Sequence, residues 1–186
     1  MQCYHRLNID ISNAIRPDWK FPTLKNWASF SHHPSDIFNP TWLKHMTAIG
    51  LPPDNCLIFY TPPGVQAPFS HTDRNPVNGG SCIAGFNFVV GDDPLDMVWF
   101  NQSALESQRR VLYTGTGVPY ETFPVDFNYE IDRCRIGNTL TLVRTDIPHW
   151  IGADTLSTVG RWSVSYRTTR TWSSWEDCLT GVPAGI

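Results

Sequence analysis

The stretch GRWSVSYR, residues 160–167, alternates between polar and apolar side chains after its glycine. Successive side chains of a β-strand point to opposite faces. One face of such a strand would carry the apolar residues Trp162, Val164 and Tyr166. The other face would carry the polar residues Arg161, Ser163, Ser165 and Arg167. The pattern therefore predicts a half-buried strand whose polar face either meets solvent or binds a ligand.

Further short β-rich runs precede this strand, separated by turns that contain Gly, Asn or Pro. They cover residues 56–60, 81–90, 97–100, 120–123, 128–134 and 138–144. One clear helix comes before them, NPTWLKHMTAIG at 39–50, with Asn39 as its cap and Gly50 after its last turn. One helix followed by many short strands predicts a mainly β fold, a sandwich or a barrel.

The chain of 186 residues suits a single domain. We expect three parts, namely an N-terminal extension at 1–55, a β core at 56–169 and a C-terminal tail at 170–186. Residues 1–38 look irregular. Residues 101–119 look like an excursion from the core, with one or two helical turns in 101–110 and a loop at 113–119.

Composition bears on the partners and on the compartment. The formal net charge is −3 and the pI is near 6.0, whereas nucleic-acid binders usually show a basic patch or a pI above ~9. A nucleic-acid partner is therefore not expected. The five cysteines are widely spaced and form no CxxC pair, which favours reduced thiols in a cytoplasmic protein. Neither a signal peptide nor an apolar stretch of ~20 residues is present, so we expect no membrane segment.

The segment FSHTD, residues 69–73, follows a turn rich in Pro and Gly. In an extended backbone, the side chains of His71 and Asp73 point the same way and can reach one ion. Two imidazoles and one carboxylate form the facial triad that holds Fe(II) and leaves coordination positions open. His149, in TLVRTDIPHWIGA, is the candidate for the second imidazole. The alternative is that His71 and Asp73 are solvated loop residues.

The polar face of the strand at 160–167 can also be interpreted as part of a ligand-binding site. Arg161 offers a planar guanidinium to a carboxylate, and the Ser163 hydroxyl can donate beside it. Such a pair suits a dicarboxylate ligand. The alternative is a strand with one face in water, which explains the alternation equally well.

Taken together, HTD at 71–73, the distal His149 and Arg161-x-Ser163 resemble the 2-oxoglutarate and Fe(II)-dependent dioxygenases. The segment IFYTPPG, residues 58–64, resembles the stretch before the first iron ligand in prolyl-hydroxylase-like members. The resemblance spans about residues 56–169 and covers neither the first 50 residues nor the excursion. It implies a double-stranded β-helix of the jelly-roll or cupin kind, with Fe(II), 2-oxoglutarate and O₂ as cofactor and cosubstrates.

The resemblance also implies roles for single residues. His71, Asp73 and His149 would bind iron, Arg161 would pair with the distal carboxylate of 2-oxoglutarate, and Ser163 would assist. Weaker candidates for contact with the cosubstrate or substrate are Tyr60, Arg167, Asn87 and Arg74. The separation of His149 and Arg161 exceeds the commonest family spacing by one or two residues. Arg167 lies on the same strand face and is the alternative cosubstrate ligand.

The resemblance thus implies an oxygenase. Related halogenases have a small residue at the carboxylate position, so Asp73 favours hydroxylation or another oxidation over halogenation. The expected substrate is a peptide or an amino-acid-like small molecule. Two other classes remain open at this point. One is a non-catalytic jelly-roll protein that binds a small molecule, and the other is a cupin metalloenzyme that does not use 2-oxoglutarate.

Overall fold

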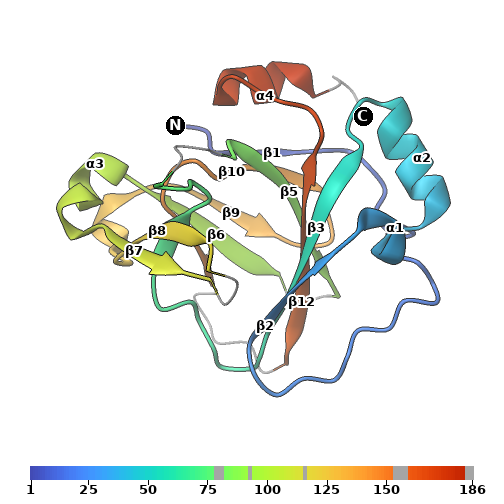
Figure 1. Cartoon of the computed structure of the whole chain (residues 1–186), viewed down its shortest axis with the longest axis horizontal. Helices are drawn as coiled ribbons and strands as arrows, with labels where there is room; N and C mark the ends of the chain where they lie inside the picture. Colours follow the sequence, from blue (N-terminus) through green and yellow to red (C-terminus); the bar gives the residue numbers. More distant parts are fainter. Residues whose placement is uncertain (78–81, 92–93, 115–116, 153–158, 183–186) are drawn as a thin grey trace.

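The computed structural model describes residues 1–77, 82–91, 94–114, 117–152 and 159–182 (Figure 1). Within these residues the strands form two antiparallel sheets of six strands each. The first sheet has the order β1 (Tyr4–Arg6), β10 (Thr141–Arg144), β5 (Ala84–Val90), β12 (Arg161–Thr168), β3 (Pro53–Thr61) and β2 (Ala28–His32). The second sheet has the order β7 (Arg110–Tyr113), β8 (Pro119–Phe123), β4 (Ser70–Thr72), β11 (His149–Gly152), β6 (Leu95–Phe100) and β9 (Glu130–Ile136). The expected mainly β fold is confirmed.

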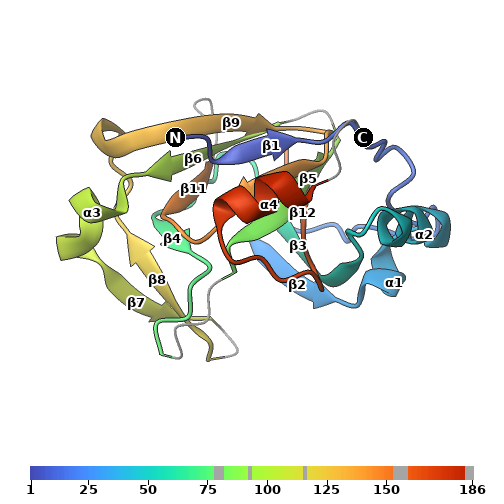
Figure 2. The same ribbon diagram turned by 90° about the horizontal axis from the view of Figure 1, so that it is seen from above.

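In two stretches of the chain, consecutive strands alternate between the two sheets. The chain passes from β3 to β4, β5 and β6 by crossing from one sheet to the other each time, and it does so again from β9 to β12. The sheets come together along β1 and β9, where the Cys3 amide donates to the Asp132 carboxylate at 2.6 Å. From there they diverge toward β2 and β7 (Figure 2).

Helices cover the outer face of the first sheet (Figure 2). They are α1 (Pro34–Ile37), α2 (Pro40–Ala48) and α4 (Trp175–Gly181). Their buried side chains pack with those of β5 and β12 in the largest apolar cluster, whose members include Ile37, Trp42, Met46, Phe86, Phe88, Val164, Tyr166 and Trp175. The apolar face of the strand at 160–167 therefore packs into this cluster.

Less helical structure packs on the outer face of the second sheet than on that of the first. The short helix α3 (Gln102–Leu105) buries Leu105 against apolar side chains of three strands, namely Val98, Phe100, Phe123 and Trp150. Two 3-10 turns complete the helical elements of the described residues, η1 (Glu106–Gln108) and η2 (Phe127–Tyr129). No described helix combines the length and the apolar character that crossing a membrane requires.

The space between the sheets changes character along its width. Near β1 and β9 it is filled by an apolar cluster, which contains Cys3, Val89, Met97, Trp99, Cys134, Ile136 and Val143. Beside β12 it is polar. Arg161 is only 5% exposed and Ser165 only 9%, so the polar face of β12 is buried between the sheets rather than in water. A buried polar face costs free energy unless its groups find partners. Such partners have to come from neighbouring strands, from the second sheet or from a ligand.

Several local expectations are confirmed. The helix at 39–50 is α2, where the Asn39 side chain accepts from the Thr41 amide and Gly50 takes a positive φ of 79°. The β-rich runs all contain strands, and the helical turns expected at 101–110 are α3 and η1.

One expectation for an irregular segment is wrong. Residues 1–38 contain β1, β2 and α1, and both strands extend the first sheet, by pairing with β10 and β3. β1 and β2 could not be expected from local sequence, because the strands that they pair with, β10 and β3, lie elsewhere in the chain. The tail contains α4. The expected loop at 113–119 is confirmed at Thr114, Gly117 and Val118, and residues 115–116 lie outside the described residues. Its two end residues belong to strands, since Tyr113 ends β7 and Pro119 begins β8, and these strands pair as a hairpin at the edge of the second sheet.

Candidate metal centre

Strand pairing brings the two histidines together. β4 and β11 are antiparallel neighbours, and His71 lies directly opposite His149. Directly opposite residues share a face of the sheet, with their Cβ atoms about 4.5–5.5 Å apart. The two imidazole rings are accordingly close, with centroids 4.4 Å apart and planes at 55°. His71 and His149 are 78 positions apart in sequence, and the pairing of β4 with β11 brings them together.

Asp73 completes the group from the residue that follows β4. Its amide donates to the Thr145 carbonyl at 2.9 Å, which fixes the backbone there. Its Oδ1 lies 3.7 Å from His71 Nε2. The ligand atoms of His71, Asp73 and His149 all lie within 4.8 Å of one another, close enough for the three to hold one ion. The metal-ligand set expected from the sequence is therefore assembled.

Hydrogen bonds orient two of the three ligands. His149 Nδ1 lies 3.0 Å from the Ile147 carbonyl, which can only accept, so Nδ1 carries the proton and Nε2 presents its lone pair. Arg167 forms an ion pair with Asp73 Oδ2 and also donates to Ser165 Oγ at 2.9 Å. Because Oδ2 is engaged, Oδ1 is the oxygen of Asp73 that faces the imidazoles.

Electrostatics keep all three groups in the form that binds metal. Burial lowers the pKa of His149 to about 3, and the neighbouring His71 acts in the same direction. Burial also lowers the pKa of His71. For Asp73, burial raises the pKa, but the charge of Arg167 and the nearby imidazoles outweigh it and hold the pKa below its ordinary value. Metal ligands must be deprotonated, and these three are so at neutral pH.

These shifts predict how the stability of the metal-free protein depends on pH. Unfolded His149 gains a proton near pH 6.5, whereas folded His149, with a pKa of about 3, does not. The unfolded state binds more protons between these values, so stability falls as the pH falls through this window. His149 alone contributes a slope of about 1.4 kcal/mol per pH unit there. Urea unfolding in a chelator at pH 7, 6 and 5 measures it. A His149→Gln variant should flatten the profile, and equal stability of the unaltered protein at pH 7 and 5 would contradict the argument.

Arg161 and Arg167 occupy the two ends of the polar face of β12. They lie six residues apart, so their Cα atoms are about 20 Å apart along the strand. Arg161 is buried and donates to the Pro94 carbonyl at 3.4 Å. Ser163 and Ser165 lie between the two arginines on the same face. Arg167 contacts the metal-ligand group through its ion pair with Asp73.

Asn87 lies beside this row. It pairs with Ser165 on one side and Thr141 on the other, and its amide nitrogen approaches the sulfur of Met97 at 4.0 Å across the space between the sheets. Its Oδ1 is buried and accepts no hydrogen bond within the described residues. A buried amide oxygen without a donor is costly, which is consistent with a ligand binding in this space.

Two other candidates lie away from the group. Tyr60 pairs with Trp162, and their rings pack 5.0 Å apart on the apolar face of the first sheet. That face is opposite to the one that carries Arg167, so the structure does not bring Tyr60 to the site, contrary to expectation. Arg74 follows Asp73 and is exposed, with no ion pair among the described residues.

The structure adds three residues that the sequence did not indicate. The Tyr120 ring meets the His71 ring edge-on, with centroids 6.4 Å apart. Thr145 anchors the amide of Asp73. Gly85 in β5 leaves room for the guanidinium of Arg167. Tyr120 lies in a strand that the sequence predicts. The sequence does not reveal that this strand pairs with the one that contains His71.

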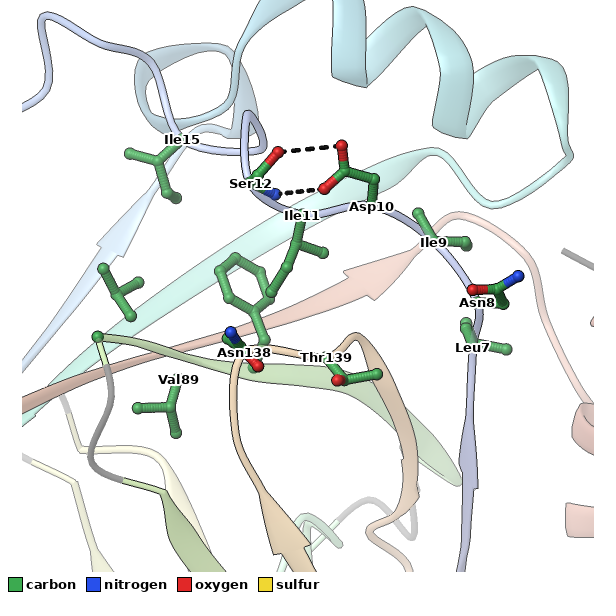
Figure 3. A pocket seen from close by; sticks show the side chains of 13 residues that line it. Leu7, Asn8, Ile9, Asp10, Ile11, Ser12, Ile15, Val89, Asn138 and Thr139 are labelled. Atoms are coloured by element: carbon green, nitrogen blue, oxygen red, sulfur yellow. Dashed lines mark hydrogen bonds between the residues drawn. The ribbon is translucent and has the colours of Figure 1, made fainter.

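A separate pocket of about 540 Å³ lies between the segment at 7–15 and the end of β5 (Figure 3). Asp10 carries the one ionisable side chain among its lining residues. That carboxylate already accepts from the amide and hydroxyl of Ser12, at 2.8 and 3.0 Å. The pocket therefore offers no ligand set that competes with the His71, Asp73 and His149 group.

Comparison with protein-family models finds none that matches the chain, and no curated protein matches its sequence.

Proposed function

We propose that the protein is a non-haem Fe(II) and 2-oxoglutarate-dependent dioxygenase that hydroxylates a peptide or an amino-acid-like substrate. The observation that carries this proposal is the His71, Asp73 and His149 group, in which two neutral imidazoles and one carboxylate oxygen lie within 4.8 Å of one another. Three such ligands on one side of an ion leave other coordination positions open. A closed structural zinc site would use four ligands, usually including thiolates.

The strand order supports the same proposal. Strands β3, β12, β5 and β10 of the first sheet face β4, β11, β6 and β9 of the second, and the chain alternates between them. We interpret this as a double-stranded β-helix, a jelly-roll relative, extended by β1 and β2 on one sheet and by the β7–β8 hairpin on the other. In this interpretation the metal group lies between the two sheets, where a ligand can be enclosed.

The polar face of β12 is the proposed place for 2-oxoglutarate. Arg161 would pair with the distal carboxylate, and Ser163 would donate beside it. We favour Arg161 over Arg167 for this role because Arg161-x-Ser163 resembles the Arg-x-Ser pattern of these dioxygenases, whereas Arg167 pairs with the proposed metal ligand Asp73. The buried Oδ1 of Asn87, without a donor among the described residues, is consistent with a ligand in the same space.

Bound Fe(II) would supply, with 2-oxoglutarate and O₂, the oxidising chemistry. The residues of this chain would hold and orient the components. Ile147 fixes the tautomer of His149, and Arg167 fixes which oxygen of Asp73 is presented. The buried face of β12 would limit the access of water to the cosubstrate.

The Arg161→Ala variant tests the cosubstrate assignment. Charge-assisted hydrogen bonds contribute about 1.5–3 kcal/mol, so the Kd for 2-oxoglutarate should rise about 10–100-fold. Binding is read anaerobically from the visible charge-transfer band of the Fe(II) and 2-oxoglutarate complex. Arg135→Ala, at an arginine whose side chain is 65% exposed on β9, is the matched control.

The same experiment separates the competing functions. A metal-dependent activity that survives Arg161→Ala unchanged would favour a cupin metalloenzyme that does not use 2-oxoglutarate. The absence of the band in the unaltered protein, with equal 2-oxoglutarate binding by His149→Ala, would favour a non-catalytic binding protein. Succinate release with candidate substrate pools, and products heavier by one oxygen atom, would identify the substrate.

A further inference from the structure

The β7–β8 hairpin continues the second sheet outward from the metal group. Arg110 of β7 pairs with Thr122 of β8, Thr122 pairs with His71, and His71 pairs with His149. These four residues form one row across four strands and share one face of the sheet. Neighbouring strands lie about 4.8 Å apart, so the backbone of Arg110 is about 10 Å from that of His71.

The next row of the hairpin is apolar. Leu112 pairs with Tyr120 on the same face, and the Tyr120 ring contacts the His71 ring. Leu112 is 36% exposed, and neither residue joins any of the three apolar clusters of the described residues. This face of the hairpin is therefore continuous with the metal group but is not used for the core.

The opposite wall has matching residues. Leu57 and Phe59 of β3 pair with Ser165 and Ser163, so they share the buried polar face of the first sheet. Both side chains are half-buried, and they too are absent from the apolar clusters. Because the sheets diverge toward β2 and β7, the hairpin and β3 flank the more open side of the molecule (Figure 2).

Arg110 adds a charge to this apolar surface. Its neighbour Arg109 forms ion pairs with Glu106 and with the buried Glu121. Arg110, by contrast, is exposed and its guanidinium forms no ion pair within the described residues. An edge strand that exposes Val111, Leu112 and Tyr113 is an aggregation risk unless it has a use.

We propose that the inner face of the β7–β8 hairpin binds the substrate, and that the substrate combines an apolar body with an anionic group, a carboxylate or a phosphate, which pairs with Arg110. The apolar body lies against Leu112 and Tyr120 on one side and Leu57 and Phe59 on the other. Strand β7, which lies within the excursion, is then an element that selects the substrate. This inference rests on the proposed oxygenase function, since it treats the metal group as the reaction centre.

Three aryl probes test the proposal: 3-phenylpropionate, phenyl phosphate and the neutral 3-phenylpropanol. Their binding to the protein loaded with Mn(II) and 2-oxoglutarate is measured by saturation-transfer NMR. Paramagnetic relaxation of their ring protons reports nearness to the metal. At least one anion should bind about two- to fivefold more tightly than the alcohol, as for an exposed ion pair. The stronger of the two anions indicates whether the natural group is a carboxylate or a phosphate.

Variants assign the effect to the hairpin. Arg110→Gln should remove the preference for the anions, Tyr120→Ala should weaken all three probes, and Arg135→Gln should change nothing. Equal binding of the alcohol, a preference that survives Arg110→Gln, or probe protons that Mn(II) does not relax would each overturn the proposal. Relaxation of 2-oxoglutarate in the same sample tests the oxygenase function separately. If that relaxation is absent while the preference depends on Arg110, the oxygenase function fails and the anion site stands.

Discussion

Fe(II) should bind the His149→Ala variant more than about 100-fold more weakly than the unaltered protein. Loss of a residue that merely hydrogen-bonds to a metal ligand costs about 10–100-fold in affinity, so loss of a ligand should cost more. His149 Nε2 is presented by the hydrogen bond from Nδ1 to Ile147, and alanine offers no replacement. Anaerobic titration with Fe(II), or with Mn(II) followed by electron paramagnetic resonance, measures the change.

The control is His45→Ala. His45 lies on α2, outside the ligand group, so its loss should leave the affinity for Fe(II) unchanged. Because His149 is only 2% exposed, circular dichroism and a second variant, His149→Gln, distinguish ligand loss from misfolding. An affinity that stays within about threefold in a folded His149 variant would refute the assignment, since a lost ligand should exceed the cost of a lost outer partner.

Part of the fold could be predicted because its signals are local. The alternation at 160–167 and the caps of α2 depend only on nearby residues, and the strand and the helix are both confirmed. The burial of the strand's polar face depends on the second sheet and has no local signal. β1 could not be found this way. Its sequence YHR has no apolar alternation, and it is a strand because β10 offers an edge for pairing. α4 has local signals of its own, since Ser174 caps it and two acidic residues lie in its first turn.

Some features of the metal site could likewise be predicted from local sequence, and others depend on the fold. The spacing of His71 and Asp73 indicated a shared direction, and the structure brings both to His149. The ion-pair partner of Asp73 could not be predicted. Arg161 and Arg167 share a strand face, and the direction of the chain after β4 determines which of them lies beside Asp73. The position of Tyr60 could not be predicted either. The run CLIFY at 56–60 is apolar on both faces, and only the packing of Cys56 and Ile58 in the core shows which face Tyr60 shares.

Gly85→Ala should lower metal affinity or turnover about 10–100-fold without unfolding the protein, as for loss of an outer partner of a ligand. A Cβ added to Gly85 would lie 2.6 Å from Cζ of Arg167 and closer still to Nη1, so the guanidinium has to move. Its displacement breaks the ion pair with Asp73 and frees the carboxylate to rotate. Gly85 has no positive φ, so alanine brings no backbone strain. Metal titration and succinate formation measure the effect, and urea unfolding checks the stability.

A double-mutant cycle distinguishes this cause from a general disturbance of β5. In an Arg167→Gln background the shorter side chain leaves space for the added methyl group, so Gly85→Ala should cost little further. Gly137→Ala is the matched control, since the nearest neighbour of its added Cβ is Pro94 at an ordinary 3.9 Å. Additive losses in the double variant would show that Gly85 acts independently of Arg167. Strongly non-additive losses would instead locate its effect in the Arg167 and Asp73 ion pair, and would make the glycine a positioning residue of the metal centre.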